Sequence, residues 1–142
     1  IMTNKNLVVI KRTLPASAAR VFAAWTDAEL LKQWMGPGKV TVSEAEVDLS
    51  VGGAYRIVMN DEEGKTHVPS GHYEEIVPNE KLVFSWQWAG IEEVTRVTIE
   101  LREIGDNKTE LTLTHAGINE AEARAHHDEG WNGCLDKMPA IL

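Results

Sequence analysis

Residues 82–88 read Leu-Val-Phe-Ser-Trp-Gln-Trp, where large apolar side chains alternate with smaller or polar ones. A period of two is typical of a β-strand, because successive side chains point to opposite faces of a sheet. The same alternation recurs in further runs, separated by turn-forming Gly, Asn and Asp: residues 40–49, 55–59, 67–77, 97–101 and 111–115. These runs predict an antiparallel meander with one wet face and one covered face.

The residues before this meander predict one strand and two short helices. Residues 7–14 form a β-branched and apolar run that is typical of a strand. Ser17 and Asp27 are short polar residues, which favour the first position of a helix. The second helix is expected over residues 28–34, and Gly36-Pro37-Gly38 ends it.

The last segment predicts a single long helix from Glu120 to about Lys137. Asn119 and Glu122 form a candidate capping box. Pro139 predicts a kink or an end at Met138, since proline cannot continue a helix. The order of elements indicates an α+β fold. A curved antiparallel sheet of about six to seven strands then wraps around the long helix, and the gap at one end is a natural ligand site.

Length and charge exclude several classes of protein. The chain has 142 residues, which is enough for one domain with a core. Its net charge of −8 argues against binding to nucleic acid or to an anionic membrane. The single cysteine, Cys134, cannot form an intrachain disulfide, and residues 1–6 lack the apolar core of a secretory signal. We therefore expect a cytoplasmic protein.

Further segments occur in an order that is more specific than any one of them. They are Val21–Asp27, Leu30–Pro37, Asp48, Gly52-Gly53 with Tyr55, Gly71–Pro78, Leu82–Trp86, Leu111–His115 and Gly130–Leu135. This ordered set resembles the AHSA-like family, named after activators of a heat-shock-protein ATPase, in the START-like (SRPBCC) helix-grip superfamily of ligand-binding domains. The resemblance implies a single domain over residues 7–142. Residues 1–6 are then disordered or a remnant of expression.

Six residues are candidates for lining a ligand cavity. Trp86 and Trp88 lie near the open end of a strand with an aromatic face, where they would line the cavity. The alternative is that they pack in the core. His115 is on the same face of its strand as the apolar residues. There it would either hydrogen-bond a ligand or be a core histidine whose hydrogen bonds are made within the protein. The complete candidate set is Tyr55, Met59, Trp86, Trp88, His115 and Trp131.

Other reactive residue types have simpler explanations. His126 and His127 point about 100° apart on a helix, so they are poorly placed to chelate one metal ion, although His127 can share the face of Trp131. Cys134 is expected to be a buried hydrophobe rather than a nucleophile. Arginines at positions 56, 96 and 102 fall on the polar parity of the sheet, and one turned inward would favour a carboxylate ligand.

The sequence therefore predicts a protein that binds a small hydrophobic or aromatic molecule, with a stress or resistance role as one context. The first alternative is a protein-interaction module that stimulates a chaperone ATPase. The second is a cyclase or hydrolase of the same superfamily, for which only His115 and Cys134 offer chemistry. We expect binding rather than catalysis, without a metal or cofactor. A homodimer is compatible with the resemblance.

Overall fold

The computed structural model describes residues 6–142, and residues 1–5, with most of the expected N-terminal extension, lie outside the described part. Seven strands and three helices make up most of it, together with a two-residue strand and a terminal 3-10 turn. In chain order they are β1 (Leu7–Leu14), α1 (Ala18–Thr26), α2 (Ala28–Trp34), β2 (Thr41–Val47), β3 (Ala54–Asn60), β4 (Thr66–His67), β5 (Pro69–Val77), β6 (Lys81–Trp88), β7 (Thr95–Gly105), β8 (Lys108–Ala116), α3 (Ala121–Lys137) and the 3-10 turn (Met138–Ile141).

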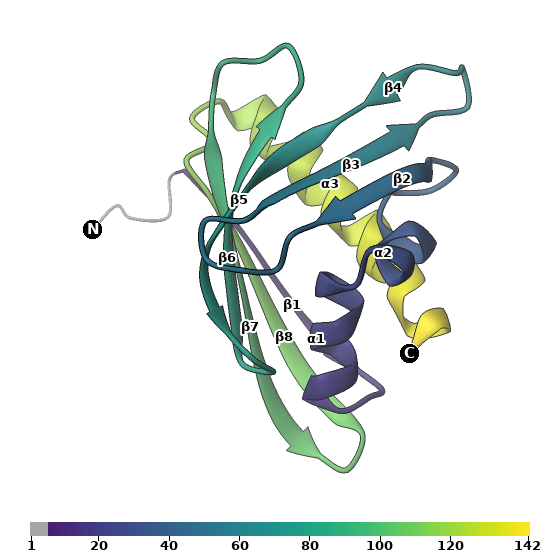
Figure 1. Ribbon diagram of the computed structural model, residues 1–142, viewed down its shortest axis with the longest axis vertical. Coiled ribbons are helices and arrows are strands. Elements are labelled where there is room, and N and C mark those ends of the chain that lie inside the picture. Colours follow the sequence, from purple (N-terminus) through teal and green to yellow (C-terminus); the bar gives the residue numbers. More distant parts are fainter. Residues whose placement is uncertain (1–5) are drawn as a thin grey trace.

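All strands pair antiparallel, in the spatial order β1-β8-β7-β6-β5-β3-β2, while β4 pairs with β3. Figure 1 shows the sheet curling around α3, with α1 and α2 beside the C-terminal half of that helix. This confirms the predicted helix-grip α+β fold, including the strand count and the two short helices after β1.

The expected strand over residues 67–77 is divided in two. Pro69 begins β5 because it has no N–H to offer to a continuous ladder, and Thr66 and His67 pair separately with β3. Register shifts at Val42/Glu44 and at Tyr73/Glu75 mark bulges, which bend strands and increase their twist. The curl needed to surround a helix therefore has local causes.

The capping residues of the first two helices are as predicted, and that of the third is not. Ser17 accepts from the backbone N–H of Arg20, and Asp27 from that of Glu29 at 2.8 Å. The capping box at Asn119 is wrong, because α3 is preceded by Glu120 and has no side-chain cap. Arg124 instead donates from Nη1 to the carbonyl oxygens of Ile118 and Asn119, which fixes the loop before α3 but caps none of the helix N–H groups.

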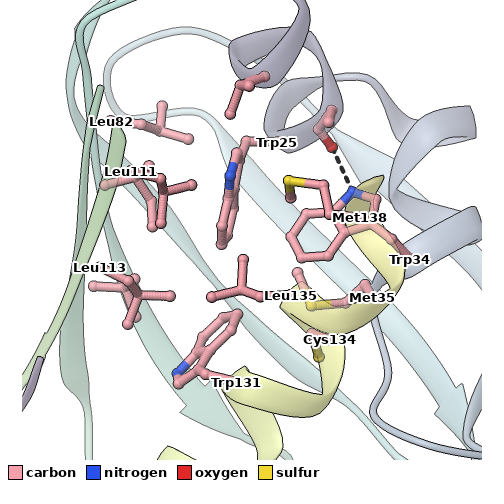
Figure 2. Close-up of a cluster of buried hydrophobic side chains, with 14 of the residues drawn as sticks. Trp25, Trp34, Met35, Leu82, Leu111, Leu113, Trp131, Cys134, Leu135 and Met138 are labelled. Carbon is pink, nitrogen blue, oxygen red and sulfur yellow. Dashed lines mark hydrogen bonds between the residues drawn. The ribbon is translucent and has the colours of Figure 1, made fainter. Parts of the chain in front are cut away.

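The C-terminal end of α3 follows the expectation from Pro139. The α-helix stops at Lys137 and the chain tightens into the 3-10 turn, with Met138 fully buried. Figure 2 shows the core between the sheet and this end of α3. The labelled side chains come from α1, α2, the loop after α2, the sheet, α3 and the 3-10 turn: Trp25, Trp34, Met35, Leu82, Leu111, Leu113, Trp131, Cys134, Leu135 and Met138.

Two tryptophans fasten α1 and α2 to each other. The indole N–H of Trp34 donates to the carbonyl of Ala24 at 2.9 Å, as drawn in Figure 2. Its ring meets that of Trp25 edge to face, with centroids 4.6 Å apart. This geometry gives both residues a structural role, and it fixes the loop that follows α2.

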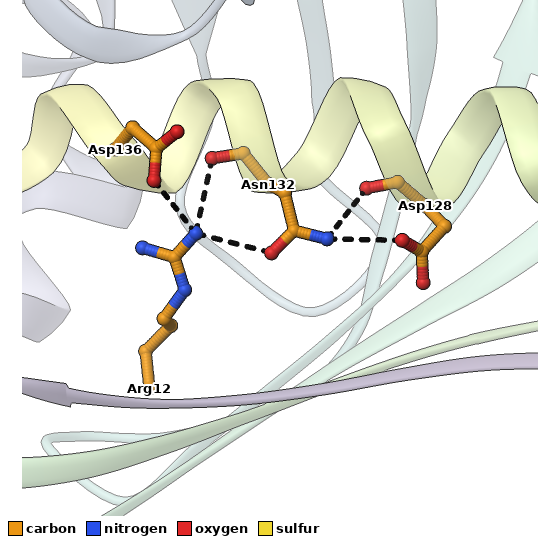
Figure 3. A network of polar contacts seen from close by, with 4 residues as sticks. All are labelled: Arg12, Asp128, Asn132 and Asp136. Carbon is orange, nitrogen blue, oxygen red and sulfur yellow. Dashed lines mark hydrogen bonds and ion pairs between the residues drawn. The ribbon is translucent and has the colours of Figure 1, made fainter.

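Polar contacts hold the other side of α3 to strand β1 (Figure 3). Arg12 donates from Nη2 to the carbonyl and the side-chain oxygen of Asn132, and to Asp136 at 2.8 Å. Asn132 in turn donates from its amide nitrogen to Asp128. These three helix residues are spaced four apart, so they form one stripe on α3. The stripe fixes the rotation of the helix about its own axis.

Candidate functional site

A cavity of about 340 Å³ lies between the sheet and the middle of α3. Its volume is within the range of small-molecule sites. Its lining comes from four places: the loop after α2, β3, β6 and one face of α3. The lining residues are Met35, Pro37, Met59, Trp86, Trp88, His126, His127, Gly130, Trp131 and Cys134.

The cavity exists because α3 has small side chains where a tighter helix would have large ones. His126, Gly130 and Cys134 are four residues apart and share a face, with Gly130 in the middle. A Cβ added at Gly130 would meet nothing within 4 Å. The apolar stripe of α3 is confined to its second half, where Trp131 and Leu135 are buried. On the neighbouring face, the missing side chain of Gly130 leaves the space open.

A second helix glycine has the opposite environment. A Cβ added at Gly133 would lie 2.6 Å from Cβ of Pro37. This close approach holds the loop after α2 against α3, which places Met35 and Pro37 in the cavity wall. Gly36 supports the turn with a φ of 110°, a conformation that side chains other than glycine rarely adopt.

The cavity wall is connected to α3 by a hydrogen bond between Trp88 and His127. The indole N–H of Trp88 donates to Nε2 of His127 at 3.1 Å, and Nδ1 of His127 lies 2.7 Å from the carbonyl oxygen of Ala123. An indole N–H can only donate, so Nε2 is the acceptor and the proton is on Nδ1. Both ring nitrogens of a neutral His127 are thus engaged.

His115 is arranged in a similar way behind the cavity. The indole N–H of Trp131 donates to Nδ1 of His115 at 3.0 Å, while Nε2 lies 2.7 Å from the hydroxyl of Thr95. That hydroxyl donates onward to the carbonyl of Trp86. Burial, with a smaller contribution from nearby His127, lowers the pKa of His115 to about 3. Neutral His115 therefore fixes the indole of Trp131 and has no free nitrogen for acid–base chemistry.

The thiol of Cys134 is also unsuited to catalysis at neutral pH. Burial raises its pKa to about 11, although the backbone N–H of Gly36 donates to its sulfur at 3.2 Å. The reactive form of a cysteine is the thiolate, which is scarce at such a pKa. Cys134 is thus a buried apolar residue, as the sequence predicts, and it also lines the cavity.

The structure brings four of the six predicted site residues together at the cavity: Met59, Trp86, Trp88 and Trp131. His115 stands behind them, in edge-to-face contact with Trp86. Tyr55 lies deeper, beside a void of about 10 Å³, and its hydroxyl donates to the carbonyl of Ser85. Its burial raises its pKa far above the usual range of a phenol.

Sequence reasoning missed Met35, Pro37, His126, His127, Gly130 and Cys134 as lining residues. The repeat of His126, Gly130 and Cys134 at helical spacing, next to the face shared by His127 and Trp131, was the available signal for the helix residues. The loop residues gave no comparable signal, because their position depends on the contact of Pro37 with Gly133.

Lys, Arg, Asp and Glu side chains do not contribute to this wall. The three arginines of the outer sheet face point to solvent and pair with glutamates: Arg56 with Glu46, Arg96 with Glu74 and Arg102 with Glu110. Within residues 6–142, three or more His, Cys, Asp or Glu side chains nowhere gather as a metal site would require. None of the helices in the described part is long and apolar enough to cross a membrane.

The sequence family described as "Activator of Hsp90 ATPase homolog 1-like protein" matches residues 15–142. The chain belongs to this family. The match includes every cavity-lining residue, so the cavity lies wholly inside this Activator of Hsp90 ATPase homolog 1-like domain.

Solved structures agree with the family assignment. Protein CV1439 from Chromobacterium violaceum is 27% identical, with a TM-score of 0.89, over 96% of this chain and 97% of its own. The AHSA1 protein SPO3351 from Silicibacter pomeroyi is 25% identical, with a TM-score of 0.86, over 96% of both chains. No protein with a curated description matches the chain. The Activator of Hsp90 ATPase homolog 1-like fold thus extends over almost the whole sequence.

Proposed function

We propose that this protein binds a small hydrophobic molecule with an aromatic part in the cavity between β6 and α3. The observation that carries the proposal is the wall of three tryptophans: Trp86 lies 5.3 Å from Trp88 and 5.0 Å from Trp131, measured between ring centroids. The three rings are steeply inclined to one another, so a guest ring can meet both faces and edges.

The positions of these rings are held before any ligand arrives. Trp88 and Trp131 each donate to a neutral histidine, and Trp86 is almost fully buried. Preorganised walls favour binding, because fewer side chains lose freedom when the ligand enters. Met59 and Met35 complete the lining with flexible side chains, which can adapt to guests of different outline.

A fluorescence titration with N-phenyl-1-naphthylamine, a neutral probe that brightens in apolar sites, tests the proposal. The informative variant is Gly130→Leu, whose side chain would project into the cavity without a clash. Ala121→Leu, on an exposed position of the same helix, is the matched control. We expect saturable binding to the original protein, a loss of at least about tenfold in affinity for Gly130→Leu, and no change for Ala121→Leu.

Absence of binding to the original protein would overturn the proposal. Equal affinity for Gly130→Leu and the original protein, with both folded by circular dichroism, would also overturn it. The probe would then bind somewhere other than the cavity.

The family description favours a second candidate function, stimulation of a chaperone ATPase. The net charge of −8 would suit a basic surface on such a partner. The test is the ATP hydrolysis rate of a purified Hsp90-type chaperone with and without this protein. A rate increase that survives Gly130→Leu would support this function separately from ligand binding, and an unchanged rate would exclude it.

A further inference from the structure

We infer that the cavity selects uncharged aromatic molecules and rejects anionic ones, and that His126 is the residue that faces the polar end of the ligand. This inference rests on the proposed function and narrows its ligand class. It starts from the lining, which contains no Lys, Arg, Asp or Glu.

A buried anion needs hydrogen-bond donors or a cation, and apart from His126 the lining side chains present no accessible free donor and no Lys or Arg. The indole N–H groups of Trp88 and Trp131 already donate to histidines. The indole N–H of Trp86 has no hydrogen-bond partner within the described residues, but its nitrogen is buried beneath the accessible surface of the wall. A carboxylate or sulfonate in the cavity would therefore lose its hydration without receiving a partner from these three rings.

Cationic side chains near the cavity are engaged elsewhere. Lys137, close enough to lower the pKa of Cys134, donates its ammonium group to the carbonyl of Val40 at 3.1 Å. Arg124 is tied to the carbonyls that precede α3. Lys39 pairs with Glu62 on the surface. All three cations keep their charge, and Lys137 acts on Cys134 in the wall, but none of the three lines the cavity.

His126 is the polar lining residue that remains available. It lies in the cavity wall, its side chain is exposed, and it makes no hydrogen bond to another described residue. An exposed lining residue marks where the cavity meets solvent. The apolar part of a ligand would then lie against the tryptophans, and a neutral hydroxyl, carbonyl or amine would stay near His126, within reach of water.

Two probes that differ by one sulfonate test the inference. N-phenyl-1-naphthylamine is neutral, and 1-anilinonaphthalene-8-sulfonate has the same rings with a permanent negative charge. At about pH 8, where free histidines are mostly neutral, we expect the neutral probe to bind at least about tenfold more tightly than the sulfonate. His126→Arg should reduce this ratio at least about threefold by strengthening sulfonate binding.

Ala121→Arg is the control, since it makes the same change in net charge on an exposed position of the same helix. We expect it to leave the ratio unchanged. Sulfonate binding as tight as that of the neutral probe would overturn the charge selection while leaving the proposed function intact. Equal ratios for His126→Arg and Ala121→Arg would overturn the role of His126. If neither probe binds the original protein, the proposed function itself fails, and the inference with it.

Discussion

The indole N–H of Trp88 donates to Nε2 of His127 at 3.1 Å, so that a strand residue and a helix residue hold one wall of the cavity together. The bond joins β6 to the first half of α3, where apolar packing is sparse. It therefore contributes both to the stability of the fold and to the shape of the cavity.

This bond predicts an energetic coupling between its two residues. His127→Leu leaves the Trp88 indole N–H without its acceptor, and we expect it to lower the free energy of unfolding by about 1 kcal/mol. Trp88→Phe removes the donor. A double-mutant cycle by urea unfolding should give a coupling of at least about 0.5 kcal/mol. Additive effects of the two substitutions would show that the bond contributes nothing.

The two glycines of α3 predict changes of opposite sign for the same substitution. Gly130→Ala should raise the free energy of unfolding by about 0.5–1 kcal/mol, because alanine favours a helix and its methyl group meets only open space. Gly133→Ala should lower it, because its Cβ would be 2.6 Å from Cβ of Pro37. Each variant is the control for the other. Shifts in the same direction would contradict the placement of α3 against the loop.

His115 predicts a specific loss of stability in acid. An unfolded histidine takes up a proton near pH 6.5, whereas folded His115 remains neutral down to about pH 3. Between about pH 3 and pH 6.5 the unfolded state binds more protons than the folded state. The stabilisation from neutral His115 is therefore complete above about pH 6.5. It is lost as the pH falls, by at most about 1.4 kcal/mol per pH unit.

His115→Asn removes this titration and keeps a side-chain oxygen near the position of Nδ1. We expect the free energy of unfolding of the variant to change less between about pH 7 and pH 5 than that of the original protein. Parallel pH profiles would show that His115 is already charged in the folded state.

The contacts of Arg12 predict unequal effects along one stripe of α3. Arg12 is largely covered and donates to both oxygens of Asn132, whereas the side chain of Asp136 is 70% exposed. We expect Arg12→Ala to lower the free energy of unfolding by about 1–2 kcal/mol. Asp136→Ala should lower it by less than about 0.5 kcal/mol. Equal losses would mean that the exposed ion pair, rather than the bonds to Asn132, holds the helix.

Cys134 predicts slow thiol chemistry in the folded protein. Burial raises the pKa of its thiol to about 11, and its sulfur accepts from the N–H of Gly36. Reaction with the thiol reagent 5,5'-dithiobis(2-nitrobenzoic acid) should be at least about a hundredfold slower in buffer than in denaturant. Similar rates in both conditions would show that the cavity wall opens readily around Cys134.

Local patterns predicted most of the fold. The alternation at residues 82–88 appears as β6, and Ser17 and Asp27 cap the helices that their types favour. The predicted start of the last helix at Glu120 lies one residue from the observed start of α3, but the predicted capping box is absent because α3 has no side-chain cap. Pro69 indicated an irregular strand. The division into β4 and β5, however, depends on the pairing of Thr66 and His67 with β3, which the sequence does not reveal.

The candidate site was predictable where it follows strand parity. Trp86 and Trp88 lie at the cavity for that reason. Tyr55 and His115 have the same inward parity but lie deeper, since parity gives the face of a sheet and not the depth beneath a helix. The position of Gly130 opposite the tryptophans arises from how α3 crosses the sheet. That crossing depends on long-range contacts such as those of Arg12, which no local pattern contains.

The most direct test of ligand binding is the set of indole N–H signals in a ¹H–¹⁵N spectrum during titration with N-phenyl-1-naphthylamine. The chain has five tryptophans, so each signal can be assigned by substitution. We predict the largest shifts at Trp86, Trp88 and Trp131, which line the cavity, and none at Trp34, whose N–H is bonded to Ala24 outside it. Saturable binding that shifts Trp34 and leaves Trp88 unchanged would contradict the account.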